Sequence, residues 1–188
     1  MPNFEPDSEY LCGDCILRPP PFSGARSFGY YTGELGHLVR AFKFHNRRNL
    51  VALLVPFLVG TFFDAWDRDD FDMVIPVPLH PERRRVRGYN QAGLLARSLA
   101  NHTGIPFDNR VLIRKRSTAP QTGLTDTQRS ANVRDAFGCV NPERVAGQRI
   151  LLIDDVMTTG ATVASASGAL VRGGALRVSV LTLARTEK

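Results

Sequence analysis

Two short, almost entirely apolar segments constrain the fold of this chain more than any other feature. Residues 150–155 (ILLIDD) begin with four consecutive aliphatic residues, and residues 73–78 (MVIPVP) contain no polar side chain. Strands of this kind are buried on both faces, as in a parallel sheet that helices cover from each side. A proline suits the end of such a strand, where its missing N–H group does little harm.

Segments of helical character alternate with the expected strands. Helices are expected at residues 34–44, 50–63, 88–102 and 162–172, and further strands at 27–33, 111–113, 136–140 and 178–185. We expect a long functional loop at 114–134 and a solvated loop in the acidic run 67–72. The sequence therefore predicts an α/β fold, with a mostly parallel, twisted sheet, helices on both faces, and a small N-terminal region of short strands and helices.

Composition narrows the class of protein. A chain of 188 residues, 43% hydrophobic and 22% charged, is typical of one soluble globular domain with a small appendage. The longest apolar run, 50–63, contains Pro56 and Gly60 and falls short of the roughly 20 residues that span a bilayer, so we expect no membrane insertion. The polar N-terminus differs from a signal peptide, and three cysteines form no disulfide framework, so a cytoplasmic location is expected. The net charge of +6 favours an anionic partner.

The loop after the first apolar strand has the chemistry of a phosphate site. Residues 158–162 (TTGAT) lead from the strand into the next helix, so the N–H groups of 159–162 would point outward at the positive end of the helix dipole. Gly160 lets a ligand approach the backbone, and the hydroxyls of Thr158, Thr159 and Thr162 add donors. These residues predict a phosphate cradle without a lysine.

Asp154 and Asp155 lie beside this cradle, at the carboxyl end of the strand, where open parallel sheets bind ligands. Carboxylates do not bind phosphate, but they accept hydrogen bonds from the vicinal hydroxyls of a sugar. A phosphate site next to a diol site describes a ribose 5-phosphate.

Three other interpretations apply to the same segment. Asp and Thr could merely cap the helix and form a turn. An aliphatic strand that ends in an acid also fits a nucleotide triphosphatase, but the nearest approach to the required G-x-x-x-x-G-K-[ST] loop, residues 168–173, is followed by Gly174 instead of Lys. A dinucleotide site is disfavoured because the chain contains no G-x-G-x-x-G.

Residues 150–162 closely resemble the phosphoribosyl pyrophosphate motif of type I phosphoribosyltransferases. The resemblance implies that Asp154 and Asp155 hold the ribose hydroxyls and serve catalysis, and that the 5-phosphate is wrapped by Thr158, Thr159, Gly160, Ala161 and Thr162. It also assigns pyrophosphate binding to Pro78, Leu79 and His80. Arginines just beyond them, Arg87 among them, suit the same anion, although a solvated basic turn would have the same composition.

The rest of the chain resembles the ComF family. The segment 75–91 (IPVPLHPERRRVRGYNQ) is similar to its signature, and residues 18–33, 38–54 and 114–137 are similar to its other regions. The last of these regions resembles its flexible loop, which would close over the substrate with Arg114, Lys115, Arg116 and Arg129 and which carries Thr118, Gln121, Leu124, Arg129 and Asn132 at the expected places. The domain expected is 23–188, with a hood-like subregion at 24–66.

Residues 1–22 resemble the remnant of a zinc ribbon. Cys12 and Cys15 match the second half of the four-cysteine ribbon of ComF proteins, while the first Cys-x-x-Cys pair is missing. A tetrahedral zinc site needs four ligands, and Cys139 lies far along the sequence, so we expect no metal bound by the protein itself.

Two functions follow from these resemblances. The first is transfer of phosphoribose from phosphoribosyl pyrophosphate to an unknown acceptor, with Mg²⁺ bound to the substrate. Thr158 stands where purine-salvage relatives carry a base-activating Asp, which argues against purine salvage. The second is a non-catalytic adaptor in DNA uptake that binds a helicase partner or, through Lys43, Arg47, Arg48 and the arginines of 83–87, single-stranded DNA. In that case the ribose phosphate site would be a sensor or a relic.

Overall fold

The computed structural model describes residues 17, 19–44, 47–116 and 135–187 and contains a four-stranded sheet in the order β1-β6-β5-β2. The strands are β1 (Gly24–Tyr30), β2 (Met73–Pro76), β5 (Arg149–Met157) and β6 (Arg177–Arg185). All three pairings between them are parallel, which confirms the predicted sheet. Beside β2, Phe107 forms a further parallel bridge with Val74.

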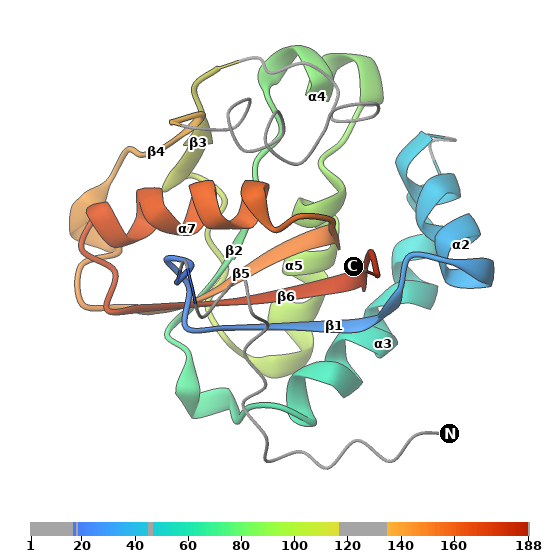
Figure 1. The fold of residues 1–188 in the computed structure, drawn as a ribbon, viewed down its shortest axis with the longest axis horizontal. Helices are drawn as coiled ribbons and strands as arrows, with labels where there is room; N and C mark the ends of the chain where they lie inside the picture. The colour runs from blue at the N-terminus through green and yellow to red at the C-terminus, as the bar shows by residue number, and fades with distance from the viewer. Residues whose placement is uncertain (1–16, 18, 45–46, 117–134, 188) are drawn as a thin grey trace.

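Helices cover both faces of this sheet, as the aliphatic strands predict (Figure 1). One face carries α3 (Leu50–Phe63) and α5 (Gln91–Thr103), and the other carries α7 (Ala161–Arg172). Two further helices, α2 (Gly33–Phe44) and α4 (Pro81–Arg87), follow the carboxyl ends of β1 and β2.

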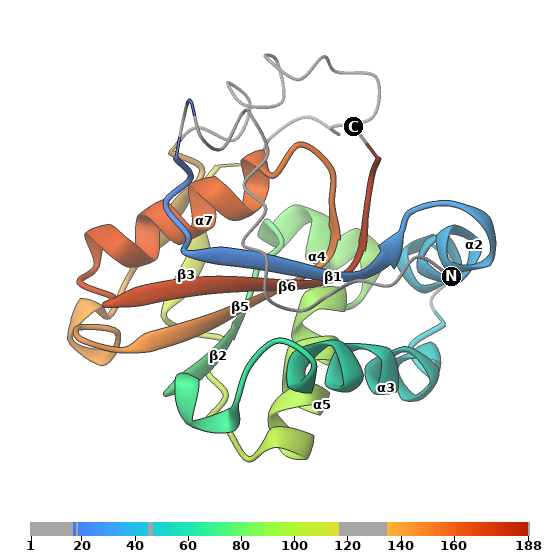
Figure 2. The ribbon, with the colours of Figure 1, turned by 60° about the horizontal axis from the view of Figure 1, so that its bottom comes forward.

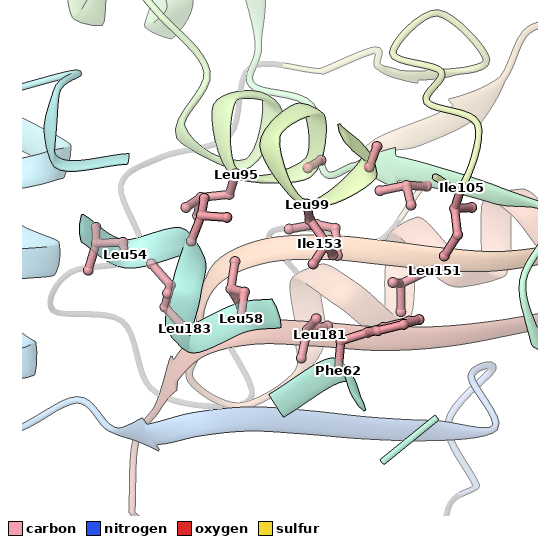
Figure 3. Packing of buried hydrophobic residues seen from close by; sticks show 14 of the residues in the cluster. Leu54, Leu58, Phe62, Leu95, Leu99, Ile105, Leu151, Ile153, Leu181 and Leu183 are labelled. Atoms are coloured by element: carbon pink, nitrogen blue, oxygen red, sulfur yellow. The ribbon is translucent and has the colours of Figure 1, made fainter. Parts of the chain in front are cut away.

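Alternate residues of the central strands enter two separate cores. On the α3 and α5 face the strands contribute Val74, Leu151, Ile153, Leu181 and Leu183. On the α7 face they contribute Ile75, Ile150, Leu152, Val178 and Val180. Figure 3 shows the first core, in which side chains of α3 and α5 meet those of β5 and β6. Burial on both faces explains why these strands need no polar alternation.

Two of the expected strands lie outside the main sheet. β3 (Leu112–Arg114) and β4 (Phe137–Cys139) pair with each other in an antiparallel ribbon, and β4 packs near α7. Short strands of three residues give no sequence signal of their pairing direction, so periodicity alone could not separate them from the parallel sheet.

Several boundaries differ from the sequence-based expectation, whereas α3 has the expected bounds. β1 begins and ends three residues earlier than expected, and α5 begins at Gln91 because a separate helix, α4, precedes it. Gly88 ends α4 in the left-handed region, at φ 82°, where glycine is favoured.

The prediction that the acidic run 67–72 is a purely solvated loop is wrong. The run contains the 3₁₀ helix Arg68–Asp70, and Phe71 is buried in the core. Asp72 accepts hydrogen bonds from the Arg149 guanidinium at 2.6 Å and 3.0 Å, which ties the run to the start of β5. Hydrogen bonds from Arg149 lower the pKa of Asp72 to about 2.

The two faces of α3 make a matched test of this packing. Leu58 is fully buried against the sheet, and Leu53 on the same helix is 50% exposed. Leu58→Ala should lower the free energy of unfolding by about 2–5 kcal/mol, because it removes buried methyl groups and leaves a cavity. Leu53→Ala should change it by less than about 1 kcal/mol. Urea unfolding measures both, and equal effects would contradict the orientation of α3.

Candidate functional site

The carboxyl edge of the sheet, where β1, β5 and β2 end, is the place where three peripheral elements meet. The connection after β1 leads to α2, the connection after β2 leads to α4, and the connection after β5 leads to α7. Figure 2 shows the same arrangement turned, with α2 beyond the end of β1. Parallel strands that end together leave their connecting loops on one edge, which is where such sheets bind ligands.

Asp154 and Asp155 are the sixth and seventh of the nine residues of β5, toward this edge. Asp154 is half-buried beside Thr182 of β6, and Asp155 is buried with 6% of its surface exposed. The backbone N–H of Asp155 donates to Asp154 Oδ1 at 2.9 Å. The expected pair of adjacent carboxylates is therefore present, and the body of the sheet holds both.

Lys43, the penultimate residue of α2, reaches the same carboxylates. Its Nζ lies 3.0 Å from Asp155 Oδ1, and 5.9 Å from the centroid of the Tyr31 ring. The backbone carbonyl of Lys43 accepts a hydrogen bond from Gln91 Nε2 at 3.3 Å. Our sequence analysis assigned Lys43 only to a basic surface and missed this contact. The available signal was its position directly after Phe42, on the buried side of an amphipathic helix.

The charged groups at this edge shift one another's pKa values. Burial, and then the negative charge of Asp155, raise the pKa of Asp154 to about 7, against the opposing effects of Lys43 and Arg114. Burial disfavours the charged form of Lys43, but the attraction of Asp155 and Asp154 outweighs it, and the pKa of Lys43 is raised. Near neutral pH, the Asp154 carboxyl group is therefore partly protonated, while Lys43 stays charged.

The loop after β5 forms the start of α7 as predicted. Gly160 is the residue before the helix and has φ 78°, a conformation that favours glycine. The N–H of Ala161 donates to Thr159 Oγ1 at 3.3 Å, and the N–H of Ala164 donates to the Gly160 carbonyl at 2.8 Å. Residues 158–162 are half-buried, and the first amides of α7 follow the aspartate-bearing end of β5 directly.

The second loop of the edge follows β2. The N–H of Val77 donates to the Ile153 carbonyl at 2.8 Å, which holds the start of this loop beside β5. Pro78, Leu79 and His80 are half-buried, and His80 precedes α4 with its Nδ1 3.4 Å from Glu82 Oε2. The loop therefore leaves the sheet one strand away from the Asp154–Asp155 pair.

The basic segment is the helix α4, which our sequence analysis did not predict. Helical spacing places Arg83 and Arg87 on one side, where both are half-buried, while Arg84 and Arg85 are exposed. Arg87 Nη1 donates to Gln91 Oε1 at 3.0 Å. The four arginines of α4 thus form two groups. Two face the protein and two face solvent.

Arg114 approaches the site from β3. It is buried with 8% of its surface exposed, and its guanidinium lies 5.3 Å from the centroid of the Phe137 ring. Burial, followed by the charge of Arg83, lowers the pKa of Arg114, and Asp154 acts in the opposite direction. Arg114 thus borders the loop 114–134 as expected, but as part of a strand. Lys115 is exposed next to it.

Other expected residues lie outside the described part of the chain. These are Cys12, Cys15 and the loop residues Thr118, Gln121, Leu124, Arg129 and Asn132. Within the described ranges, no group of three His, Cys, Asp or Glu side chains could hold a metal ion. Over the same ranges, no helix has the length and apolar character to cross a membrane.

Known proteins resemble this chain over most of its length. The family model of the phosphoribosyl transferase domain matches residues 86–188. The DNA utilization protein YhgH of Salmonella typhimurium is 36% identical over 178 residues, which cover 93% of this chain and 78% of that protein. Competence protein F of Haemophilus influenzae is 34% identical over the same shares of both chains.

Among solved structures, the glutamine phosphoribosylpyrophosphate amidotransferase of Bacillus subtilis aligns at 25% identity with a TM-score of 0.46, over 73% of this chain and 26% of that chain. The family match covers more than half of the present chain, including β5, the loop 158–160 and α7. The two curated relatives extend the similarity through the N-terminal half. The chain therefore belongs to the phosphoribosyl transferase domain family and, within it, to the ComF group of competence and DNA utilization proteins.

Proposed function

We propose that this protein binds phosphoribosyl pyrophosphate together with Mg²⁺ and transfers its phosphoribosyl group to an acceptor. The observation that carries the proposal is the position of Asp154 and Asp155 on β5, directly before a half-buried loop and the N-terminus of α7. Carboxylates can accept the ribose hydroxyls there, while the amides and hydroxyls of 158–162 donate to the 5-phosphate.

The chemistry needs little from the protein beyond binding and orientation. The bond between ribose C1 and the pyrophosphate oxygen breaks, and its electron pair leaves with pyrophosphate. The acceptor forms the new bond to C1 and gives its proton to water or a base. Positive charge develops on the ribose ring as pyrophosphate departs, and the nearby carboxylates of Asp154 and Asp155 stabilise it. Thr158, which follows the strand that carries the two aspartates, has no carboxylate that could take this proton from the acceptor.

The loop 77–80 and the basic groups around it would hold pyrophosphate. Arg83 and Arg87 are half-buried on one side of α4. The pKa of buried Arg114 is lowered by the charge of Arg83 and raised by that of Asp154. Guanidinium groups suit phosphate oxygens, and like-charged neighbours are stabilised when an anion binds between them. Mg²⁺ would arrive with the ligand, held by phosphate and ribose oxygens and water, which this ion prefers. The loop 114–134, with Lys115 and Arg129, would cover the site.

The acceptor would enter from the hood, residues 24–66, within the domain 23–188. α2 of the hood stands at the carboxyl edge and contributes Lys43 next to Asp155. We also propose a cytoplasmic location, which the three-cysteine composition favours.

A first prediction concerns the stability cost of the paired carboxylates. The pKa of Asp154 is about 7 in the folded protein and 3.8 as its ordinary value, so the native state holds a proton that the unfolded chain has lost. Stability should therefore fall as pH rises from about 4 to 7 and stay low above it. Asp154→Asn should raise the free energy of unfolding at pH 8 by about 0.5–2 kcal/mol, and the gain should shrink toward pH 4. Asp69→Asn, at an exposed carboxylate, serves as the control. If Asp154→Asn and the wild-type protein were equally stable at pH 8, the ionised Asp154 carboxylate would not destabilise the fold and this prediction would be wrong.

A second prediction concerns the ligand. Isothermal titration of the wild-type protein with phosphoribosyl pyrophosphate and Mg²⁺ should show binding at one site. Asp154→Asn/Asp155→Asn should weaken it by about 100-fold or more, because the ribose hydroxyls lose their carboxylate acceptors. Asp69→Asn should bind like wild type. Absence of binding by the wild-type protein would refute the proposed function.

A second candidate function is binding of single-stranded DNA in an adaptor role, with a helicase as the further partner. One stacked pair favours it, because the guanidinium of Arg87 lies 5.2 Å from the centroid of Phe44. Near it, the guanidinium of Arg48 lies 5.0 Å from the centroid of the buried Tyr89 ring. Phe44 is 67% exposed. Arginine beside an accessible aromatic ring is the combination that binds phosphates and stacks bases.

A third prediction separates this function from the first. In fluorescence anisotropy with oligothymidylate, affinity should fall steeply with salt, and Arg48→Ala should reduce the log–log slope by about 0.7. Phe44→Ala should weaken binding by about tenfold, the loss of one stacked base. Arg172→Ala and Phe63→Ala, which change an exposed arginine and a 54% exposed phenylalanine elsewhere, are the matched controls. Equal effects of the test and control variants would refute this surface.

A further inference from the structure

Lys43 is the charged residue of the hood for which the structure gives a direct contact with the aspartate pair. Its ammonium lies 3.0 Å from Asp155 Oδ1, and its side chain is only 20% exposed. A lysine on a solvent-facing surface extends freely into water, whereas this one ends on a buried carboxylate. The contact joins α2, early in the chain, to β5.

The surroundings hold this lysine in place from several sides. Val39 and Phe42 are fully buried and fix α2 against the core. Gln91, which is itself buried, donates to the Lys43 carbonyl. The hydroxyl of Tyr89 donates to the neighbouring carbonyl of Phe42, and the Tyr31 ring flanks the ammonium. Two side chains thus anchor the last turn of α2 at the backbone, which positions the ammonium before any ligand arrives.

The contacts described above use one oxygen of each carboxylate. Lys43 contacts Oδ1 of Asp155, and the amide of Asp155 occupies Oδ1 of Asp154. Each carboxylate has a second oxygen, and an ionised carboxylate accepts about four hydrogen bonds. Lys43 can therefore remain in place while the pair accepts two hydroxyl groups.

Four charged or titratable groups from three parts of the chain surround the pair. Lys43 and Tyr31 belong to the hood, Tyr89 precedes α5, and Arg114 comes from β3. Burial raises the pKa of Tyr89, so its phenol is neutral near pH 7. Lys43 makes the direct contact, so its charge acts most strongly on Asp155.

We propose that Lys43 is a positioning residue for the phosphoribosyl ligand, a role that rests on the proposed function. Its ammonium holds one oxygen of the Asp155 carboxylate, so that the other oxygen faces the ribose hydroxyl. Because Lys43 belongs to α2, ribose binding then depends on the position of the hood. The acceptor side and the ribose side of the site are thereby connected through one ion pair.

Two measurements test this role with Lys43→Met, which keeps the length of the side chain and removes the charge. Calorimetric titration at pH 8 should show affinity for phosphoribosyl pyrophosphate and Mg²⁺ reduced by about tenfold or more, and Lys43→Arg should restore most of it. In the ligand-free protein, ¹³C NMR of the aspartate carboxyl groups should show the titration midpoint of the Asp154–Asp155 pair raised by about one pH unit. A role in packing alone would leave this midpoint unchanged.

Arg40→Met is the matched control, because it removes a positive charge from the same helix at a residue whose guanidinium lies over the Tyr31 ring. It should change neither the affinity nor the midpoint. If the wild-type protein binds the ligand and Lys43→Met binds it equally well or more tightly, the positioning role alone is overturned. An unchanged titration midpoint in Lys43→Met would also overturn it. Failure of the wild-type protein to bind would overturn the proposed function, and the positioning role with it. Thermal unfolding of each variant checks that the fold is retained.

Discussion

The parallel pairing of β5 with both β2 and β6 is the constraint on which the rest of the structure depends. β5 has a strand on each side and a hydrophobic core on each face, so its four aliphatic residues are buried. A strand enclosed in this way carries polar side chains toward its two ends. Arg149 lies at the start of β5, and Asp154 and Asp155 follow the aliphatic run toward the carboxyl edge.

The carboxyl edge combines charges that a fold would not otherwise retain. Two adjacent carboxylates, one buried and one half-buried, repel each other, and the raised pKa of Asp154 records that repulsion together with burial. Lys43 offsets part of it through Asp155. Natural sequences lose such arrangements by mutation unless function retains them, since a neutral residue would be more stable. The stability cost and the proposed ribose site therefore have the same origin in these residues.

Sequence patterns predicted the parts of the fold that have a strong local signal. The aliphatic run of β5, the apolar helix α3 and the glycine-terminated α7 appear at or near their expected bounds. The misses have different causes. α4 is a short helix rich in arginine without an apolar stripe, and the pairing of β3 with β4 depends on tertiary contacts. The candidate site divides in the same way, because the residues of one strand and one loop form a motif, whereas Lys43 meets Asp155 only through the fold.

The same tertiary contacts connect the two proposed functions. Gln91 accepts a hydrogen bond from Arg87 and donates one to the carbonyl of Lys43, whose ammonium meets Asp155. Arg87 also lies over Phe44, the exposed ring of the proposed DNA surface. The end of α2 thus contributes Lys43 to the site at the sheet and Phe44 to the surface beside it. Gln91 thus contacts one residue of the site at the sheet and one residue of the surface beside it.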